Sequence, residues 1–248
     1  MVQRLIVHAG FHKTGTTTIQ NTLAAHRDTL RPHVQIVLRN DMISLCETAR
    51  GYSISGSEFD LGLVAYEAAY LAESWQNDTI ILSSEDLMGH MPGRHGLTEY
   101  SAAPSLSATM TQTWQDACPG VEIVWLFTTR AADPWLTSCH VQHLRAGKTT
   151  LTAADYACAF KQSANLEGCV EQIRNTVAPA DVRAVALETH QANLVEPLLS
   201  VAQVPLDVRV RIKPRPAANT SPSTDEITAM LNRNRAQAPR NTRQKADR

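Results

Sequence analysis

The residues with the clearest chemical potential form a short loop after the first apolar run of the chain. Residues 10–18 read GFHKTGTTT: two glycines five positions apart, a lysine between them, then three hydroxyl residues. This is the strand, glycine-rich turn and helix layout of a phosphate-binding loop, in which backbone N–H groups and the positive end of a helix dipole attract an anion. Three threonines are unfavourable at a helix start because β-branched side chains lose χ1 freedom there. Their presence favours a ligand-binding role for the hydroxyls.

The position of the lysine distinguishes this loop from a related type. In nucleotide-hydrolysing proteins the lysine directly follows the second glycine. Here Thr16 follows Gly15, and Lys13 lies two residues before that glycine. The loop is therefore predicted to bind an anion, but not in the manner of a nucleotide-hydrolysing enzyme.

Apolar runs rich in β-branched residues predict the strands that position this loop. They cover residues 4–8, 79–83, 121–129 and 182–187, with a weaker run at 33–38. The clearest of the intervening helical patterns places these apolar residues on one face: Leu61, Val64, Ala65, Ala68, Leu71, Ala72 and Trp75. Alternating strands and helices predict a three-layer α/β/α fold with a central parallel sheet. The glycine-rich loop resembles those of the phosphate-loop nucleoside-triphosphate-hydrolase-like class, to which we therefore expect the fold to belong.

The composition bounds the kind of protein this is. The 248 residues are 43% hydrophobic and 19% charged, which suits a single globular domain. Lys plus Arg (23) and Asp plus Glu (24) nearly balance, so we expect neither a nucleic acid nor a membrane surface as partner. No apolar run has the length of a membrane helix, and the first residues do not read as a signal peptide. Five scattered cysteines without a Cys-x-x-Cys pair predict a reducing, cytoplasmic location.

The loop resembles that of a known family. Residues 11–18, FHKTGTTT, look like the 5′-phosphosulfate loop of the sulfotransferases, in particular of the bacterial sulfotransferase-family proteins with an HKTGTT loop. The resemblance implies 3′-phosphoadenosine-5′-phosphosulfate as donor, no metal, and transfer of a sulfuryl group to a hydroxyl or amine of a small-molecule or carbohydrate acceptor. Lys13 would be both catalytic and donor-binding, and the further donor-binding residues of the loop would be Thr14, Gly15, Thr16, Thr17 and Thr18.

The same resemblance implies a second donor-binding element. Sulfotransferases hold the 3′-phosphate of the donor with an arginine at the end of a strand and a serine eight residues later. Arg130 follows the predicted strand 121–129, and Ser138 lies eight residues on, in a helix that Asp133 would cap with Pro134 at its first position. A guanidinium and a hydroxyl suit a phosphate dianion.

Two acidic residues are candidates for the general base. Glu85 is the first, because a carboxylate just after the strand 79–83 would lie at the carboxyl edge of the sheet. Asp41 is the second, since it lies 28 residues after Lys13, about where several carbohydrate sulfotransferases place an acidic base. His12 is a third catalytic candidate, placed to touch donor or acceptor.

The sequence leaves two other functions open. A magnesium-dependent phosphate-loop kinase would use the acidic strand end at Glu85, but the lysine after Gly15 is missing and Arg130 is left unexplained. A non-catalytic anion-binding protein would keep the fold without turnover.

The glycine-rich C-terminal donor motif and the Lys-x-His strand of animal cytosolic sulfotransferases are absent, so no adenine or ribose contact is assigned. No metal site is predicted, because Cys139, His140 and His143 lack a fourth ligand.

The C-terminal residues differ from the rest of the chain. Residues 232–248 contain six basic residues and one acidic residue, with no apolar periodicity. We therefore expect a domain over residues 1–231 and a basic, flexible tail after it.

Overall fold

A five-stranded parallel sheet forms the centre of the molecule. The computed structural model describes residues 2–216 and 222–237. The strands are β1 (Arg4–His8), β2 (Gln35–Leu38), β3 (Thr79–Ser83), β4 (Glu122–Thr129) and β5 (Asp181–Ala186). Their order is β2-β3-β1-β4-β5, and every neighbouring pair is parallel. Because β1 is central, the loop that follows it emerges between the ends of β3 and β4.

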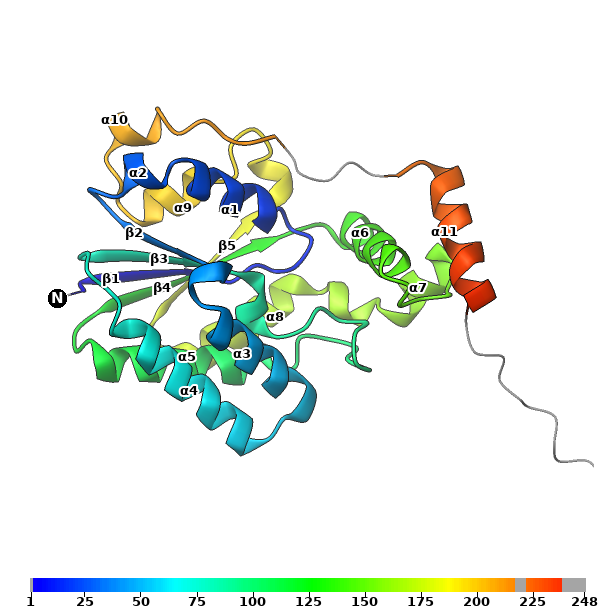
Figure 1. The fold of residues 1–248 in the computed structure, drawn as a ribbon, viewed down its shortest axis with the longest axis horizontal. Helices are drawn as coiled ribbons and strands as arrows, with labels where there is room; N and C mark the ends of the chain where they lie inside the picture. Colours follow the sequence, from blue (N-terminus) through cyan, green and yellow to red (C-terminus); the bar gives the residue numbers. More distant parts are fainter. Residues whose placement is uncertain (1, 217–221, 238–248) are drawn as a thin grey trace, which may run out of the picture.

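Helices cover both faces of this sheet (Figure 1). One face carries α1 (Thr16–Ala25), α2 (Arg27–Leu30), α9 (Glu196–Val201) and α10 (Leu206–Arg209). The other face carries α3 (Ile43–Ser55), α4 (Glu58–Ala72), α5 (Ala103–Ala117) and α8 (Leu166–Val177). Beyond the carboxyl ends of the strands lie α6 (Ala132–Arg145), α7 (Ala153–Ala159) and α11 (Thr224–Gln237). Short 3₁₀ turns complete the chain: η1 (Arg39–Asp41), η2 (Glu85–Met88), η3 (Gln162–Ala164) and η4 (Leu187–Thr189).

The two faces of the sheet bury separate apolar cores. In β1, Leu5 and Val7 point into one core and Ile6 into the other, as the two-residue period of a strand requires. Both cores exclude water from β1, which explains why this strand is a continuous apolar run. The predicted three-layer α/β/α fold with a parallel sheet is confirmed.

Several element boundaries differ from those expected. β2 begins at Gln35 rather than at 33, and β5 is shifted by one residue toward the N-terminus. α6 begins at Ala132, with Ala131 at the N-cap, so Asp133 lies in the first turn instead of capping it. The apolar face predicted over 61–75 belongs to α4, which ends at Ala72, so Trp75 packs on the core from the following turn.

The C-terminal region is helical for longer than expected. Residues 232–237, assigned to the tail by the sequence, continue α11. Asn234 Nδ2 donates hydrogen bonds of 3.0 Å to the carbonyls of Leu144 and Thr149, which secures that part of α11 against the end of α6. The rest of the predicted tail, 238–248, lies outside the described residues. Within the residues that are described, every helix is too short or too polar to span a bilayer.

Candidate functional site

The loop after β1 is fixed to β4 by backbone hydrogen bonds. The amide of Phe11 donates to the Thr128 carbonyl at 3.0 Å, and the amide of Thr128 donates to the Gly10 carbonyl at 2.6 Å. The Phe11 ring is fully buried and stacks on Phe127 with a centroid distance of 5.3 Å. The loop therefore has one defined path across the end of the sheet.

Both glycines of the loop are required by its path. Gly10 has φ +99°, and a Cβ there would lie 2.8 Å from Glu85 Cβ, so glycine lets Glu85 approach the loop. Gly15 has φ +93° at the N-cap of α1, where a Cβ would lie 2.8 Å from Leu194 Cδ1. Lys13, between them, also has a positive φ of 67°. The predicted helix start at Thr16 is confirmed.

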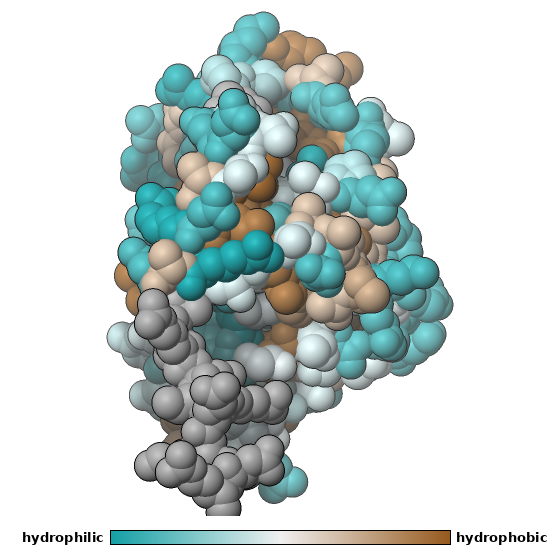
Figure 2. Space-filling view, turned by 90° about the vertical axis from the view of Figure 1, so that its right-hand side faces the viewer, coloured by the Kyte–Doolittle hydropathy of each residue, from teal (hydrophilic) through white to brown (hydrophobic). Residues whose placement is uncertain are grey.

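A cavity of about 860 Å³ opens at this end of the molecule and brings most of the predicted site residues together. The predicted residues that line it are His12, Lys13, Gly15, Thr16, Thr17, Thr18, Glu85, Arg130 and Ser138. Its remaining walls come from the segment after η2, from α6, and from the residues that precede and begin α11. Figure 2 views the molecule from this side, where hydrophilic side chains surround deeper hydrophobic ones.

Lys13 has an unusual electrostatic environment. Its Nζ donates to Gln142 Oε1 at 3.3 Å. Burial, together with the nearby cations Arg145 and Arg130, lowers the pKa of Lys13, while Glu85 acts in the opposite direction. A lysine held close to other cations and away from water interacts strongly with an anion that enters the cavity.

Arg130 and Ser138 have polar groups without protein partners. Arg130 follows β4, and its Nη1 donates to the Lys13 carbonyl at 3.2 Å. Its Nε is buried and has no hydrogen-bond partner. Among the residues that the structure describes, the Ser138 hydroxyl has no partner either. Since buried polar groups are normally satisfied, the Arg130 Nε indicates a ligand, and the partly exposed Ser138 hydroxyl is free to contact it.

Glu85 lies at the start of η2 and faces the loop. Its Oε2 accepts a hydrogen bond of 2.7 Å from Gln20 Nε2 of α1. One wall of the cavity thus contains a carboxylate held in place by an amide, close to the loop that carries Lys13. This is a suitable arrangement for a general base.

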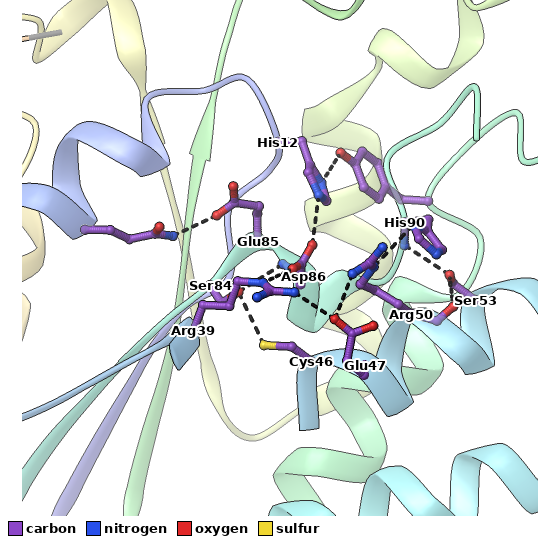
Figure 3. A network of polar contacts seen from close by, with 12 residues as sticks. His12, Arg39, Cys46, Glu47, Arg50, Ser53, Ser84, Glu85, Asp86 and His90 are labelled. Atoms are coloured by element: carbon purple, nitrogen blue, oxygen red, sulfur yellow. Dashed lines mark hydrogen bonds and ion pairs between the residues drawn. The ribbon is translucent and has the colours of Figure 1, made fainter. Parts of the chain in front are cut away.

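His12 belongs to a network of polar side chains on the β3 side of the cavity (Figure 3). Its Nε2 lies 3.4 Å from Asp86 Oδ1, and its Nδ1 lies 3.0 Å from the Tyr100 hydroxyl. Arg39 Nε donates to Asp86 Oδ2 at 2.6 Å and Arg39 Nη2 to Glu47 Oε1 at 2.7 Å. Burial opposes the ionisation of Asp86, but the hydrogen bonds from His12 and Arg39 outweigh it and hold the pKa of that carboxyl well below its ordinary value.

The ionisation of Asp86 defines the roles of the His12 nitrogens. An ionised carboxylate only accepts hydrogen bonds, so His12 Nε2 carries a hydrogen, and in the neutral imidazole Nδ1 then accepts from the Tyr100 hydroxyl. His12 lines the cavity, yet both its nitrogens are directed at protein partners. This geometry favours a role in positioning the loop over direct proton transfer.

Two predicted residues do not reach the cavity. The Thr14 side chain is fully buried, and its hydroxyl bonds to the Phe11 carbonyl at 2.5 Å and to Thr128 Oγ1 at 2.6 Å, so it secures the loop instead of contacting a ligand. Asp41 is the last residue of η1, the turn that follows the edge strand β2. Its Oδ2 accepts from the Leu38 amide at 2.9 Å and from Arg27 Nη2 at 2.6 Å, so capping and ion pairing occupy it.

Several lining residues were not identified from the sequence. Arg94, Gln142 and Arg145 supply polar groups, while Pro222 and Ile227 close one side. Gln142 and Arg145 follow Ser138 at spacings of four and seven residues, the period of one helix face, which was a usable signal. Arg94 lies in an irregular segment with no such signal.

The histidines considered as metal ligands have other partners. His140 Nε2 lies 2.9 Å from the Leu151 carbonyl, and His143 Nδ1 lies 2.7 Å from the Tyr156 hydroxyl. Cys139 is fully buried, and burial raises the pKa of its thiol. These side chains pack α6 against α7 and the segment before it.

Comparison with solved structures gives an informative likeness. No protein-family model matches the sequence, and no curated protein matches it. Among solved structures, the chain is similar to a sulfotransferase from Alicyclobacillus acidocaldarius, with a TM-score of 0.51 and 15% sequence identity over 95% of this chain and 94% of that one. At that identity, the likeness shows that the two chains share a fold across nearly their whole length.

Proposed function

We propose that the protein is a sulfotransferase that moves a sulfuryl group from 3′-phosphoadenosine-5′-phosphosulfate to a hydroxyl or amine acceptor. The observation that carries the proposal is the single cavity shared by the loop lysine Lys13, the N-terminus of α1, Arg130 and Ser138. The resemblance of the loop to sulfotransferase loops and the fold shared with a bacterial sulfotransferase support the same conclusion.

The loop and α6 divide the binding of the donor between them. Backbone N–H groups from Lys13 to Thr17 bind the 5′-phosphate at the positive end of α1, and the Thr16, Thr17 and Thr18 side chains face the same cavity. Arg130, whose buried Nε has no protein partner, and the Ser138 hydroxyl bind the 3′-phosphate. Thr14 contributes only its backbone.

The chemistry requires a cation and a base at the loop. The donor supplies the sulfuryl group. Lys13 stabilises the negative charge that develops on the bridging oxygen as the bond to sulfur breaks. Glu85 takes the proton of the acceptor hydroxyl as its oxygen bonds to sulfur, and 3′,5′-adenosine bisphosphate leaves. Lys13 and the helix end supply the positive charge, so the proposal includes no metal.

Thermal unfolding with 3′,5′-adenosine bisphosphate tests the donor site. A ligand at a hundred times its dissociation constant stabilises the folded state by about 2.7 kcal/mol. For a chain of this size we expect a rise in Tm of about 5 to 10 °C, without any metal. The rise should be absent in Arg130→Ala, which lacks the proposed 3′-phosphate ligand.

The control ligand is ATP with magnesium. A rise in Tm with ATP and magnesium alone would favour a kinase and refute the role given to Arg130. Binding of the bisphosphate without turnover of the donor on any acceptor would favour a non-catalytic anion-binding protein.

A further inference from the structure

Arg94 is a cation in the cavity that the proposed donor contacts do not use. It lies between η2 and α5 and lines the cavity together with Met91. The backbone around it forms a compact turn, in which the Leu97 amide donates to the Arg94 carbonyl at 2.9 Å and the Gly93 amide to the Leu97 carbonyl at 2.7 Å. Arg94 is therefore presented to the cavity from a defined turn.

This turn packs directly on α6. Gly93 has φ +93°, and a Cβ there would lie 2.4 Å from His143 Cε1, so only glycine lets the turn approach the ring this closely. His143 is itself buried and bonded to Tyr156. The backbone next to Arg94 is thus held against the C-terminal half of α6.

The Arg94 side chain has no counter-charge within the described residues. Its Nε is buried without a hydrogen-bond partner, and no ion pair joins it to any residue of 2–216 or 222–237. Its charge acts on the imidazoles of His90 and His143. Burial and then the neighbouring cations, Arg94 among them, lower the pKa of both imidazoles to about 4. A buried guanidinium N–H without an acceptor is unfavourable unless a ligand supplies one.

The turn that carries Arg94 meets α6 further along the helix than Ser138, the proposed 3′-phosphate ligand. The cavity face of α6 runs from Ser138 through Gln142, which binds Lys13, to Arg145. At 1.5 Å of rise per residue, this face extends about 10 Å from Ser138 to Arg145. The turn with Arg94 packs on His143, which lies five residues beyond Ser138 and so about 7.5 Å further along the axis of α6.

We propose that Arg94 forms an oxyanion subsite for the acceptor, so that the preferred acceptors carry a carboxylate or sulfate group beside the hydroxyl or amine that is modified. This inference rests on the proposed function. Lys13, Arg94 and Arg130 outnumber the lining acids Glu85 and Asp133, and the proposed donor contacts use only Lys13 and Arg130 of these three cations. A guanidinium binds carboxylate or sulfate through two parallel N–H bonds.

The test measures whether a second anion, sulfate, binds to the protein when 3′,5′-adenosine bisphosphate is already bound. With 3′,5′-adenosine bisphosphate saturating, sodium sulfate is titrated against sodium chloride of equal ionic strength, and the rise in Tm is recorded. The wild type should show a saturable sulfate effect. Arg94→Gln should raise the apparent dissociation constant for sulfate about tenfold or more, because a charge-assisted bidentate contact is lost. Its unfolding without ligand should be unchanged, since Arg94 has no partner there.

Arg183→Gln is the matched control, because it removes the same charge from an exposed ion pair with Asp181 on β5. This control should bind sulfate as the wild type does. Equal sulfate affinity in the wild type and Arg94→Gln would overturn the proposal and place the sulfate at Lys13 instead.

Loss of bisphosphate binding in Arg94→Gln would also overturn the proposal, by making Arg94 a donor ligand. If the bisphosphate fails to stabilise even the wild type, the donor assignment fails. The same sulfate titration without nucleotide then still decides whether Arg94 binds an oxyanion.

Discussion

The two sides of the cavity are built in different ways. On the β4 side, the loop after β1 is held mainly through its backbone: Phe11 pairs with Thr128, and the Lys13 and His12 carbonyls accept from Arg130 and from Trp135 Nε1. On the β3 side, side chains bind side chains, and the charged network runs from His12 through Asp86 to Arg39. The first arrangement fixes a shape that suits a constant ligand such as a nucleotide. The second arrangement depends on individual side chains, so single substitutions can change it.

The largest effect should come from the centre of the cavity, where the two sides meet. We expect Lys13→Ala to lower the rate of sulfuryl transfer about a thousandfold, comparable to the loss of a transition-state hydrogen-bond donor. The rate at which the donor is converted to 3′,5′-adenosine bisphosphate, with acceptor present, measures this effect. Lys148→Ala, on the exposed turn after α6, removes the same charge and should be as active as the wild type. An active Lys13→Ala enzyme would refute the mechanism.

The next effect separates the two acidic residues predicted as bases. Glu85 lines the cavity, while Asp41 is paired with Arg27 at the sheet edge. Glu85→Gln should lower kcat about a hundredfold, because an amide cannot accept the acceptor proton. Asp41→Asn should leave kcat within about a factor of two, since an ion pair of exposed side chains contributes little. The reverse ranking would show that the base lies on the side of β2.

The contrast between the two sides also explains what the sequence could predict. Strand, loop and helix follow one another along residues 4–25, so the order of residue types is enough to place Lys13 and Gly15. Arg130 and Ser138 are likewise separated by a fixed strand-to-helix geometry. These patterns can be recognised in a single sequence because the geometry of the backbone at each of them depends on residues that are neighbours along the chain.

The β3 side lacked such a signal. His12, Arg39 and Asp86 come from three separate elements, and only the sheet order brings them together. Asp41 illustrates the difficulty: its distance from Lys13 along the chain suggested a base, whereas in the structure β3 lies between β2 and β1 and the Asp41 carboxylate accepts a hydrogen bond from the Leu38 amide in its own turn. Arg94 depends on an irregular segment whose path is determined by contact with His143.

The network of His12, Asp86 and Arg39 should make the free energy of unfolding depend on pH. Asp86→Asn should lower the free energy of unfolding by about 2 kcal/mol at pH 7, since hydrogen bonds to a charged group are lost. The folded-state pKa of Asp86 is depressed, so its stabilisation is complete above the unfolded-state value near 4 and declines as the pH falls below it. Urea unfolding of both proteins from pH 7 to pH 3 should therefore show a difference that narrows below about pH 4. A constant difference would mean that the carboxylate charge is not what stabilises the network.

The smallest effect compares two adjacent hydroxyls on α6. Ser138 and Thr137 both line the cavity, but Thr137 Oγ1 donates to the Asp133 carbonyl at 2.9 Å, whereas the Ser138 hydroxyl has no partner among the described residues. Ser138→Ala should weaken the binding of 3′,5′-adenosine bisphosphate about fivefold, the equivalent of about 1 kcal/mol for one hydrogen bond. Thr137→Val keeps the side-chain volume and should bind the bisphosphate like the wild type, because its hydroxyl is already engaged within the helix. Calorimetric titration of both variants measures the difference. Equal losses of affinity in the two variants would show that the 3′-phosphate lies along the whole first half of α6. Unchanged affinity in Ser138→Ala would leave Arg130 as the one proposed ligand of that phosphate.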